Sequence, residues 1–151
     1  MDPVKLLVTE RDFDPGAEIA LLSSGQGESG AIATFIGLVR GAPDSVNAMT
    51  LEHYPGMTEK QIALIIGEAR SRWTLDRVTV IHRVGRLLPG ERIVFVGVAG
   101  RHRGESFAAC EFLMDWLKTK APFWKLEETP SGERWVEARD EDGKRAERWG
   151  R

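Results

Sequence analysis

The chain has 151 residues and a formal net charge of -2, with 42% hydrophobic and 29% charged residues. We expect a soluble globular protein, and the small charge argues against nucleic acid or an anionic membrane as a partner. No apolar run approaches the roughly 18 residues that span a bilayer, and the first residues lack the pattern of a secretion signal. The single cysteine, Cys110, excludes an internal disulfide, so we expect a cytoplasmic location.

The N-terminal part of the chain predicts a strand followed by a helix. Residues 5–10 are a short strand candidate. Asp14 precedes Pro15, and this pair is typical of a helix start because the carboxylate caps the helix and proline suits its first position. The predicted helix stops near Gly25.

Two strands and a helix follow. Residues 31–40 are apolar at both alternating positions, which predicts a buried strand covered on both faces. A second strand over 46–54 would form a hairpin with it. Thr58 and Gln61 have the spacing of a capping box, so we expect a helix that ends near Arg72–Trp73.

The second half of the chain repeats this alternation. Residues 77–85 and 91–100 are rich in β-branched side chains and predict strands. An amphipathic helix is expected over 105–120, and a late strand over 134–140. We expect residues 141–151, which are charged, to be a flexible tail. The apolar stripe of the helix would consist of Phe107, Cys110, Met114 and Leu117. This order predicts one α+β domain over residues 1–151, with a mixed or mostly antiparallel sheet.

The segment 100–106, "GRHRGES", lies between a predicted strand and a predicted helix. Backbone N–H groups at a helix start bind anions, and His102 and Arg103 would add charge there. A small anionic ligand is one interpretation of this segment, and a solvated basic loop is the other.

The segment 118–125, "KTKAPFWK", combines lysines with aromatic residues. Lys118 falls in the last turn of the predicted helix, where a cation suits the helix dipole. It also borders the apolar stripe, and a wall formed by Phe123 or Trp124 would desolvate its amine and make it reactive. Lys125 would add a second cation. A surface cluster remains the alternative.

Other polar residues have simpler explanations. Arg40 ends a predicted strand, and Arg139 stands in an acidic stretch where a local ion pair suffices. His53 and His82 fit strand patterns and look structural, and the histidine spacing predicts no metal site. Cys110 is expected to be buried and inert.

Five blocks of the sequence carry a family resemblance. They are "LEHYPGMTEK" (51–60), "VTVIHRVG" (78–85), "GERIVFVGVAGRHR" (90–103), "FLMDWLKTKAPFWK" (112–125) and "RWVEARD" (134–140). In this order they resemble the large, catalytic subunit of molybdopterin synthase. The match runs from about residue 30 to residue 140.

The resemblance implies a reaction, a fold and partners. The family converts cyclic pyranopterin monophosphate to molybdopterin by installing two dithiolene sulfurs. The sulfur arrives as a thiocarboxylate at the C-terminal glycine of a small ubiquitin-like subunit, whose Gly-Gly tail threads into the large subunit. The implied fold is an α/β hammerhead with an additional small antiparallel sheet. The implied assembly is a homodimer of large subunits within a heterotetramer, with no cofactor.

Site residues carry over by position. Lys118 resembles the central catalytic lysine, as general acid/base or as a transiently acylated amine, and Lys125 resembles the second essential lysine. Arg139 resembles an arginine that reaches the neighbouring subunit's site. Residues that match substrate-binding positions are Leu38, Val39, Arg40, His102, Arg103, Leu126 and Glu127.

The sequence departs from the family pattern at a few positions. The loop after Arg40 is short, Lys120 stands where arginine is frequent, and "GRHRG" has an extra arginine and flanking glycines. Two other functions stay open. One is a docking module for a Gly-Gly tail without chemistry of its own, and the other is an unrelated phosphometabolite enzyme with Lys118 as a Schiff-base nucleophile.

Overall fold

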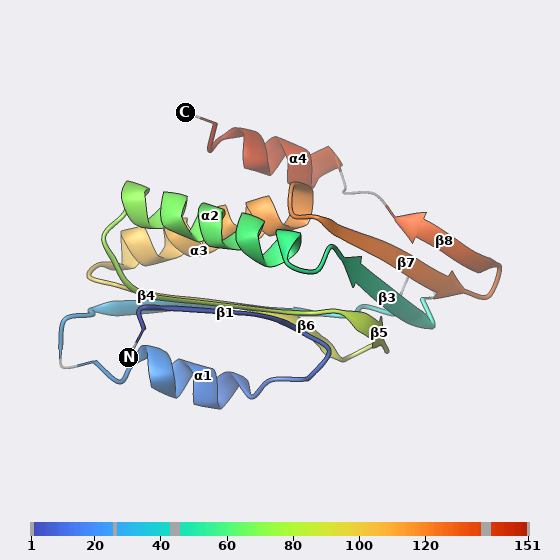
Figure 1. Ribbon diagram of the computed structural model, residues 1–151, viewed down its shortest axis with the longest axis horizontal. Coiled ribbons are helices and arrows are strands. Elements are labelled where there is room, and N and C mark those ends of the chain that lie inside the picture. Colours follow the sequence, from blue (N-terminus) through green and yellow to red (C-terminus); the bar gives the residue numbers. More distant parts are fainter. Residues whose placement is uncertain (1, 26, 43–45, 137–139, 151) are drawn as a thin grey trace.

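The structure is a computed structural model that describes residues 2–25, 27–42, 46–136 and 140–150. In chain order these form β1 (Val4–Thr9), α1 (Pro15–Leu22), β2 (Ala31–Leu38), β3 (Ala48–His53), α2 (Met57–Arg72), β4 (Leu75–Arg83), β5 (Gly85–Leu87), β6 (Arg92–Gly100), α3 (Arg103–Thr119), β7 (Phe123–Thr129), β8 (Gly132–Val136) and α4 (Asp140–Glu147) (Figure 1). Within these ranges, no helix is long and apolar enough to cross a membrane.

The strands form two four-stranded sheets. The first has the order β1-β4-β6-β2, in which β1 is parallel to β4 and the other pairs are antiparallel. The second has the order β5-β3-β7-β8 and is antiparallel throughout. Helices α2 and α3 cover one face of the first sheet and α1 covers the other, while the second sheet extends from one end (Figure 1). The predicted α+β class, with a mixed sheet and an additional antiparallel sheet, is confirmed.

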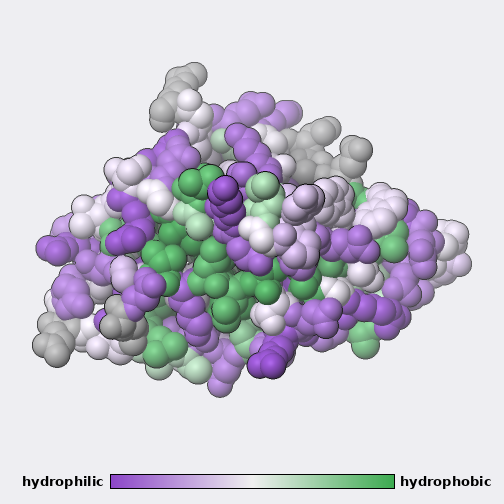
Figure 2. All heavy atoms as spheres, viewed as in Figure 1, coloured by the Kyte–Doolittle hydropathy of each residue, from purple (hydrophilic) through white to green (hydrophobic). Residues whose placement is uncertain are grey.

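The main core lies between the first sheet and helices α2 and α3. The central strands β4 and β6 are almost fully buried because helices cover both of their faces. On the α1 side, Phe13 packs edge-to-face on Phe95, with ring centroids 5.9 Å apart. Figure 2 shows apolar side chains across the middle of one face of the molecule, ringed by hydrophilic residues. The β1 residues that pack partly buried against the main core are Val4, Leu6 and Val8.

The prediction for β2 is wrong in two respects. It is an edge strand, and Ile32, Ile36 and Leu38 are exposed, so it is not covered on both faces. It also forms no hairpin with β3, because β2 pairs with β6 in the first sheet and β3 pairs with β5 and β7 in the second. Apolar composition predicted a strand correctly, but it carries no information about which sheet the strand joins.

The second sheet contains two strands that the sequence analysis missed. β5 begins at the last residue of the strand predicted over 77–85, and β7 begins directly after the link that follows α3. The helix α3 begins at Arg103, and its apolar stripe includes Cys110, Met114 and Leu117 as predicted. Phe107 was wrongly placed on that stripe, because its side chain is 65% exposed.

The two predicted helix starts had different outcomes. The Asp14 carboxylate accepts a backbone N–H from the first turn of α1 at 3.3 Å, which confirms the predicted cap. At α2 the capping box of Thr58 and Gln61 is wrong. The N-cap is Gly56, at φ 83°, and no side chain caps this helix. A positive φ suits glycine because it has no Cβ.

The C-terminal residues, which were expected to be a flexible tail, form α4 and a short extension that contacts α3. Arg148 and the indole N–H of Trp149 both donate to the Asp115 carboxylate, at 2.9 and 2.6 Å. The Trp149 ring packs edge-to-face against Trp73 and Phe112. An apolar ring among charged neighbours therefore ties this end of the chain to α2 and α3.

Candidate active site

Lys118 lies in the last turn of α3 with an exposed side chain. The N–H groups of Lys120 and Ala121 both donate to the carbonyl of Trp116, at 2.8 and 3.2 Å, and this closes the helix. A cation at this end interacts favourably with the helix dipole. The structure therefore presents the Lys118 amine where α3 turns into the link to β7.

The link between α3 and β7 is bonded to the start of α2. The Thr58 hydroxyl donates to the carbonyl of Pro122 at 3.2 Å and accepts the N–H of Tyr54 at 2.9 Å. The blocks "HYPGMT" and "KAPF", which lie 64 residues apart across this bond, therefore meet at the site. The hydroxyl predicted to cap a helix instead fixes the backbone that joins the two lysines.

A buried histidine lies beside this link. The His82 ring stacks on Phe123 with a centroid distance of 3.9 Å and an interplanar angle of 18°. Burial lowers the pKa of His82 to about 4, the hydrogen bond to the Arg83 carbonyl opposes this shift, and the nearby charges of Lys118 and His53 add to it. His82 is therefore a neutral imidazole close to Lys118.

The strand pattern around His82 predicted a structural residue and gave no connection with the lysines. Its place near the end of a buried strand was the one available signal. Phe123, expected as a wall for Lys118, stacks on this histidine. Trp124, the other expected wall, alternates to the opposite face of β7.

Lys125 lies on β7, and its side chain is half-buried. Its strand neighbours are Leu51 on β3 and Val136 on β8. Because side chains alternate along a strand, Lys125 shares a face with Phe123. Along the chain, Lys118 precedes Phe123 by five residues and Lys125 follows it by two.

The two residues after Lys125 lie on opposite faces of β7. Glu127 shares the face of Lys125 and accepts two N–H groups from Arg134, at 3.1 and 3.2 Å. Leu126 lies on the other face, opposite Trp135 of β8. Only one of these two predicted substrate contacts therefore shares the face of the lysine.

The predicted binding segment 38–40 follows the end of β2 and a register shift between Gly37 and Leu38. Leu38 and Arg40 are exposed, whereas Val39 is buried. The backbone of Val39 forms two hydrogen bonds with the turn before β6: its N–H donates to Glu91 at 2.9 Å, and its carbonyl accepts from Gly90 at 2.8 Å.

Val39 also connects this segment to β7. It belongs to a small apolar cluster with Met49, Leu51 and Leu87, and Leu51 is the direct strand neighbour of Lys125. The structure therefore brings the segment that bears Arg40 close to the strand position of Lys125.

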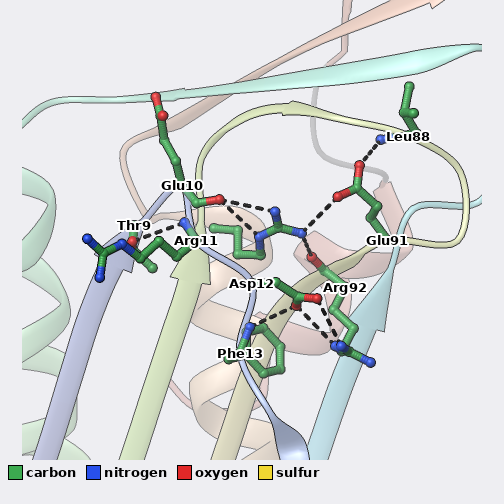
Figure 3. A network of polar contacts seen from close by, with 9 residues as sticks. Thr9, Glu10, Arg11, Asp12, Phe13, Leu88, Glu91 and Arg92 are labelled. Carbon is green, nitrogen blue, oxygen red and sulfur yellow. Dashed lines mark hydrogen bonds and ion pairs between the residues drawn. The ribbon is translucent and has the colours of Figure 1, made fainter.

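The buried Arg83 holds the turn to which Val39 is bonded, and Figure 3 labels its partners Glu10, Glu91 and Arg92. The guanidinium of Arg83 donates to the carbonyls of Glu10 and Arg92 and to the carboxylate of Glu91. The other oxygen of Glu91 accepts the N–H of Leu88 at 2.6 Å, and this bond is the main cause of a lowered pKa for Glu91. All three guanidinium nitrogens of Arg83 therefore form hydrogen bonds with the segments around this turn.

His102 and Arg103 lie at the other end of α3. They are exposed at its N-terminus. Fifteen residues separate Arg103 from Lys118, which corresponds to about 22 Å along a helix. Within one chain, these two residues therefore do not come together with the lysines.

Some predicted features lie elsewhere or outside the described residues. Arg139 is not among the described residues. Two surface cavities have volumes of about 230 and 290 Å³. The first is lined by residues 2–5, 21–22 and 77–79 and the second by residues 22–23, 25, 27 and 29–32, and no predicted site residue lines either. In the described part of the chain, no group of His, Cys, Asp and Glu could hold a metal ion. Cys110 is buried as predicted, and burial raises its pKa to about 12.

Comparisons with known proteins agree with this fold over nearly the full chain. A family model described as "MoaE protein" matches residues 8–120. The molybdopterin synthase catalytic subunit of Escherichia coli K12 is 56% identical over 151 residues, which cover 99% of this chain and 100% of the relative.

Solved structures of molybdopterin biosynthesis proteins are also similar to this chain. The molybdopterin biosynthesis MoaE protein from Burkholderia ambifaria superposes with a TM-score of 0.83 at 52% identity, over 98% of this chain and 99% of that one. A Helicobacter pylori structure, described as a complex of subunits 1 and 2 of molybdopterin-converting factor, superposes with a TM-score of 0.70 at 17% identity, over 92% of each chain. The second likeness shows the fold alone.

These matches define the class of protein, which is a catalytic subunit in molybdopterin biosynthesis. The chain belongs to the MoaE family of molybdopterin synthase catalytic subunits. It is accordingly an enzyme, a sulfurtransferase of molybdenum cofactor biosynthesis.

Proposed function

We propose that this enzyme transfers sulfur from the C-terminal thiocarboxylate of a small ubiquitin-like subunit to cyclic pyranopterin monophosphate, and that the product is the dithiolene of molybdopterin. The observation that carries the proposal is the lysine pair. Lys118 and Lys125 flank one short link that is held by Thr58 and by the His82–Phe123 stack, in a chain that belongs to this family.

Both lysines have a role in this reaction. The thiocarboxylate sulfur forms a bond to a substrate carbon as a carbon–oxygen bond at that carbon breaks, and the oxygen leaves with a proton. The acyl–sulfur bond then breaks as water adds to the acyl carbon, which returns the tail as a carboxylate. One thiocarboxylate tail is used for each of the two sulfurs. Lys118 serves as the proton donor and acceptor in these steps, or its amine is acylated transiently before water releases the tail. Lys125 stabilises the charge that develops on the substrate.

The other predicted residues bind substrate. Arg40 is an exposed cation next to Val39, which packs with the strand neighbour of Lys125, and a guanidinium suits the phosphate. His102 and Arg103 are also suited to an anion, but they lie about 22 Å along α3 from Lys118. We propose that a second copy of the chain contributes them, so that the working site needs a homodimer.

The open face of the second sheet supports a homodimer. Trp124 and Trp135 are 49% and 60% exposed. Leu126 lies two residues beyond Trp124 and directly opposite Trp135, so the two rings share one face. Large exposed aromatic residues on one face are typical of protein interfaces. The family resemblance implies that Arg139 serves the partner copy's site.

The small subunit is the remaining partner. The Helicobacter pylori structure is described as a complex of two subunits of molybdopterin-converting factor. We propose that this chain likewise binds a small subunit and that two of each form a heterotetramer without a cofactor. A tail of two glycines suits a narrow approach to Lys118, because it carries no side chains. We place the reaction in the cytoplasm, where the buried thiol of Cys110 stays reduced.

A single-turnover assay tests the proposal. The purified protein is mixed with thiocarboxylated small subunit and cyclic pyranopterin monophosphate, and the dithiolene product is oxidised to its fluorescent derivative. We expect product from the unaltered protein and none from Lys118→Ala, while both bind the small subunit. Lys120→Ala is the matched control, because it removes an exposed lysine two residues away. Binding without product from the unaltered protein would favour the docking module, and near-normal turnover by Lys118→Ala would refute the assigned role.

A further inference from the structure

We propose that His82 is a positioning residue of this enzyme, whose buried imidazole, stacked on Phe123, sets the position of Lys118 relative to Lys125. The inference rests on the proposed function of the two lysines. Nothing in the sequence pattern distinguishes this histidine from an ordinary strand residue, so it depends on the tertiary structure.

The stack joins the two sheets at the site. His82 comes from β4 of the first sheet, and Phe123 is the first residue of β7 in the second. A centroid distance of 3.9 Å at 18° means that the two rings lie face to face. Phe123 follows Lys118 by five residues and precedes Lys125 by two, so a shift of this ring moves the backbone between the lysines.

Hydrogen bonds and strand pairing hold the backbone of the same link. The carbonyl of Pro122 is bonded to Thr58, and the N–H of Phe123 donates to Ala121 at 2.8 Å. On the strand, Phe123 is opposite His53. The Phe123 ring also packs, partly buried, against the main core, and His82 contributes its stacked face-to-face contact.

The protonation of His82 suits this position. Its Nδ1 lies 2.9 Å from the carbonyl of Arg83. Because a carbonyl oxygen only accepts, Nδ1 carries the proton and Nε2 carries the lone pair. A neutral ring can lie close to Lys118 and His53, whose charges act on it, whereas an imidazolium would add another cation. The same bond involves the backbone carbonyl of Arg83. The side chain of Arg83 bonds to Glu10, Glu91 and Arg92, which are labelled in Figure 3.

A double-mutant cycle on the single-turnover rate tests the inference, with affinity for the small subunit measured in parallel. We expect His82→Ala and Phe123→Leu each to lower the rate about 10- to 100-fold with little change in affinity. The double variant should be no slower than the slower single variant, because both changes remove one contact. His82→Phe, which keeps a stacked ring, should restore most of the rate. Phe95→Leu is the control, since it removes a buried ring from the α1 side of the same sheet.

The possible outcomes separate this inference from the proposed function. No product from the unaltered protein refutes the function, and the inference with it. Product that requires Lys118, together with additive effects of the two substitutions or a normal rate for His82→Ala, overturns the inference alone. If His82→Ala does not fold, the other two single variants decide. A positioning role requires a low single-turnover rate for Phe123→Leu and a nearly normal rate for His82→Phe. A nearly normal rate for Phe123→Leu together with a low rate for His82→Phe overturns it.

Discussion

The stability of this protein should fall between pH 7 and pH 5 because of one buried side chain, His82. Burial lowers its folded-state pKa to about 4, below the ordinary value of 6.5. Between these two values the unfolded chain binds a proton that the folded chain does not. The stabilisation from the neutral imidazole is therefore fully present above pH 6.5 and is lost as the pH falls towards 4.

The two pKa values set the size of the effect. A difference of about 2.5 units corresponds to about 3 kcal/mol in full. Because the proton is only partly bound at intermediate pH, the loss between pH 7 and pH 5 amounts to about 2 kcal/mol. Carboxylates with lowered pKa, such as Asp12 beside Arg92, lose their contribution only at lower pH, so they do not obscure this window.

Urea unfolding at fixed protein concentration measures the effect. The free energy of unfolding is compared at pH 7 and pH 5 for the unaltered protein and for His82→Phe, which cannot titrate at this position. We expect the variant to lack about 2 kcal/mol of the pH-dependent loss. Equal losses in both proteins would show that His82 is not held neutral by burial and would refute the reasoning.

Three further predictions concern single contacts. Thr58→Val should lower the free energy of unfolding by about 1–3 kcal/mol, because the carbonyl of Pro122 loses its donor; an unchanged urea midpoint would contradict that bond. Trp149→Phe keeps the ring but removes the N–H bonded to Asp115, and should cost about 1 kcal/mol in the same assay, whereas no cost would show that this bond does not stabilise the fold. Cys110, buried and with its pKa raised, should react with an aromatic disulfide reagent only after unfolding; immediate labelling of the folded protein would show that the thiol is accessible.

Local patterns predicted those elements whose signals are local. The Asp14 cap, the apolar stripe of α3 apart from Phe107, and the β-branched strands β4 and β6 were confirmed, because each depends on neighbours within one or two turns or on strand alternation. β7 was missed because "PFWK" follows a helix that it terminates, and its strand character comes from pairing with β3 and β8. Likewise, Thr58 has the spacing of a helix cap but bonds to a distant carbonyl.

The sequence by itself determined the α+β class, through its order of periodic segments, and the family, through specific blocks around Lys118 and Lys125. The tertiary structure alone decided which residues share a site. It placed β2 at an edge, put His82 against Phe123, and separated Arg103 from Lys118 by the length of a helix. The physical reason is that strand pairing and ring stacking join residues far apart in the chain, and no local period records them.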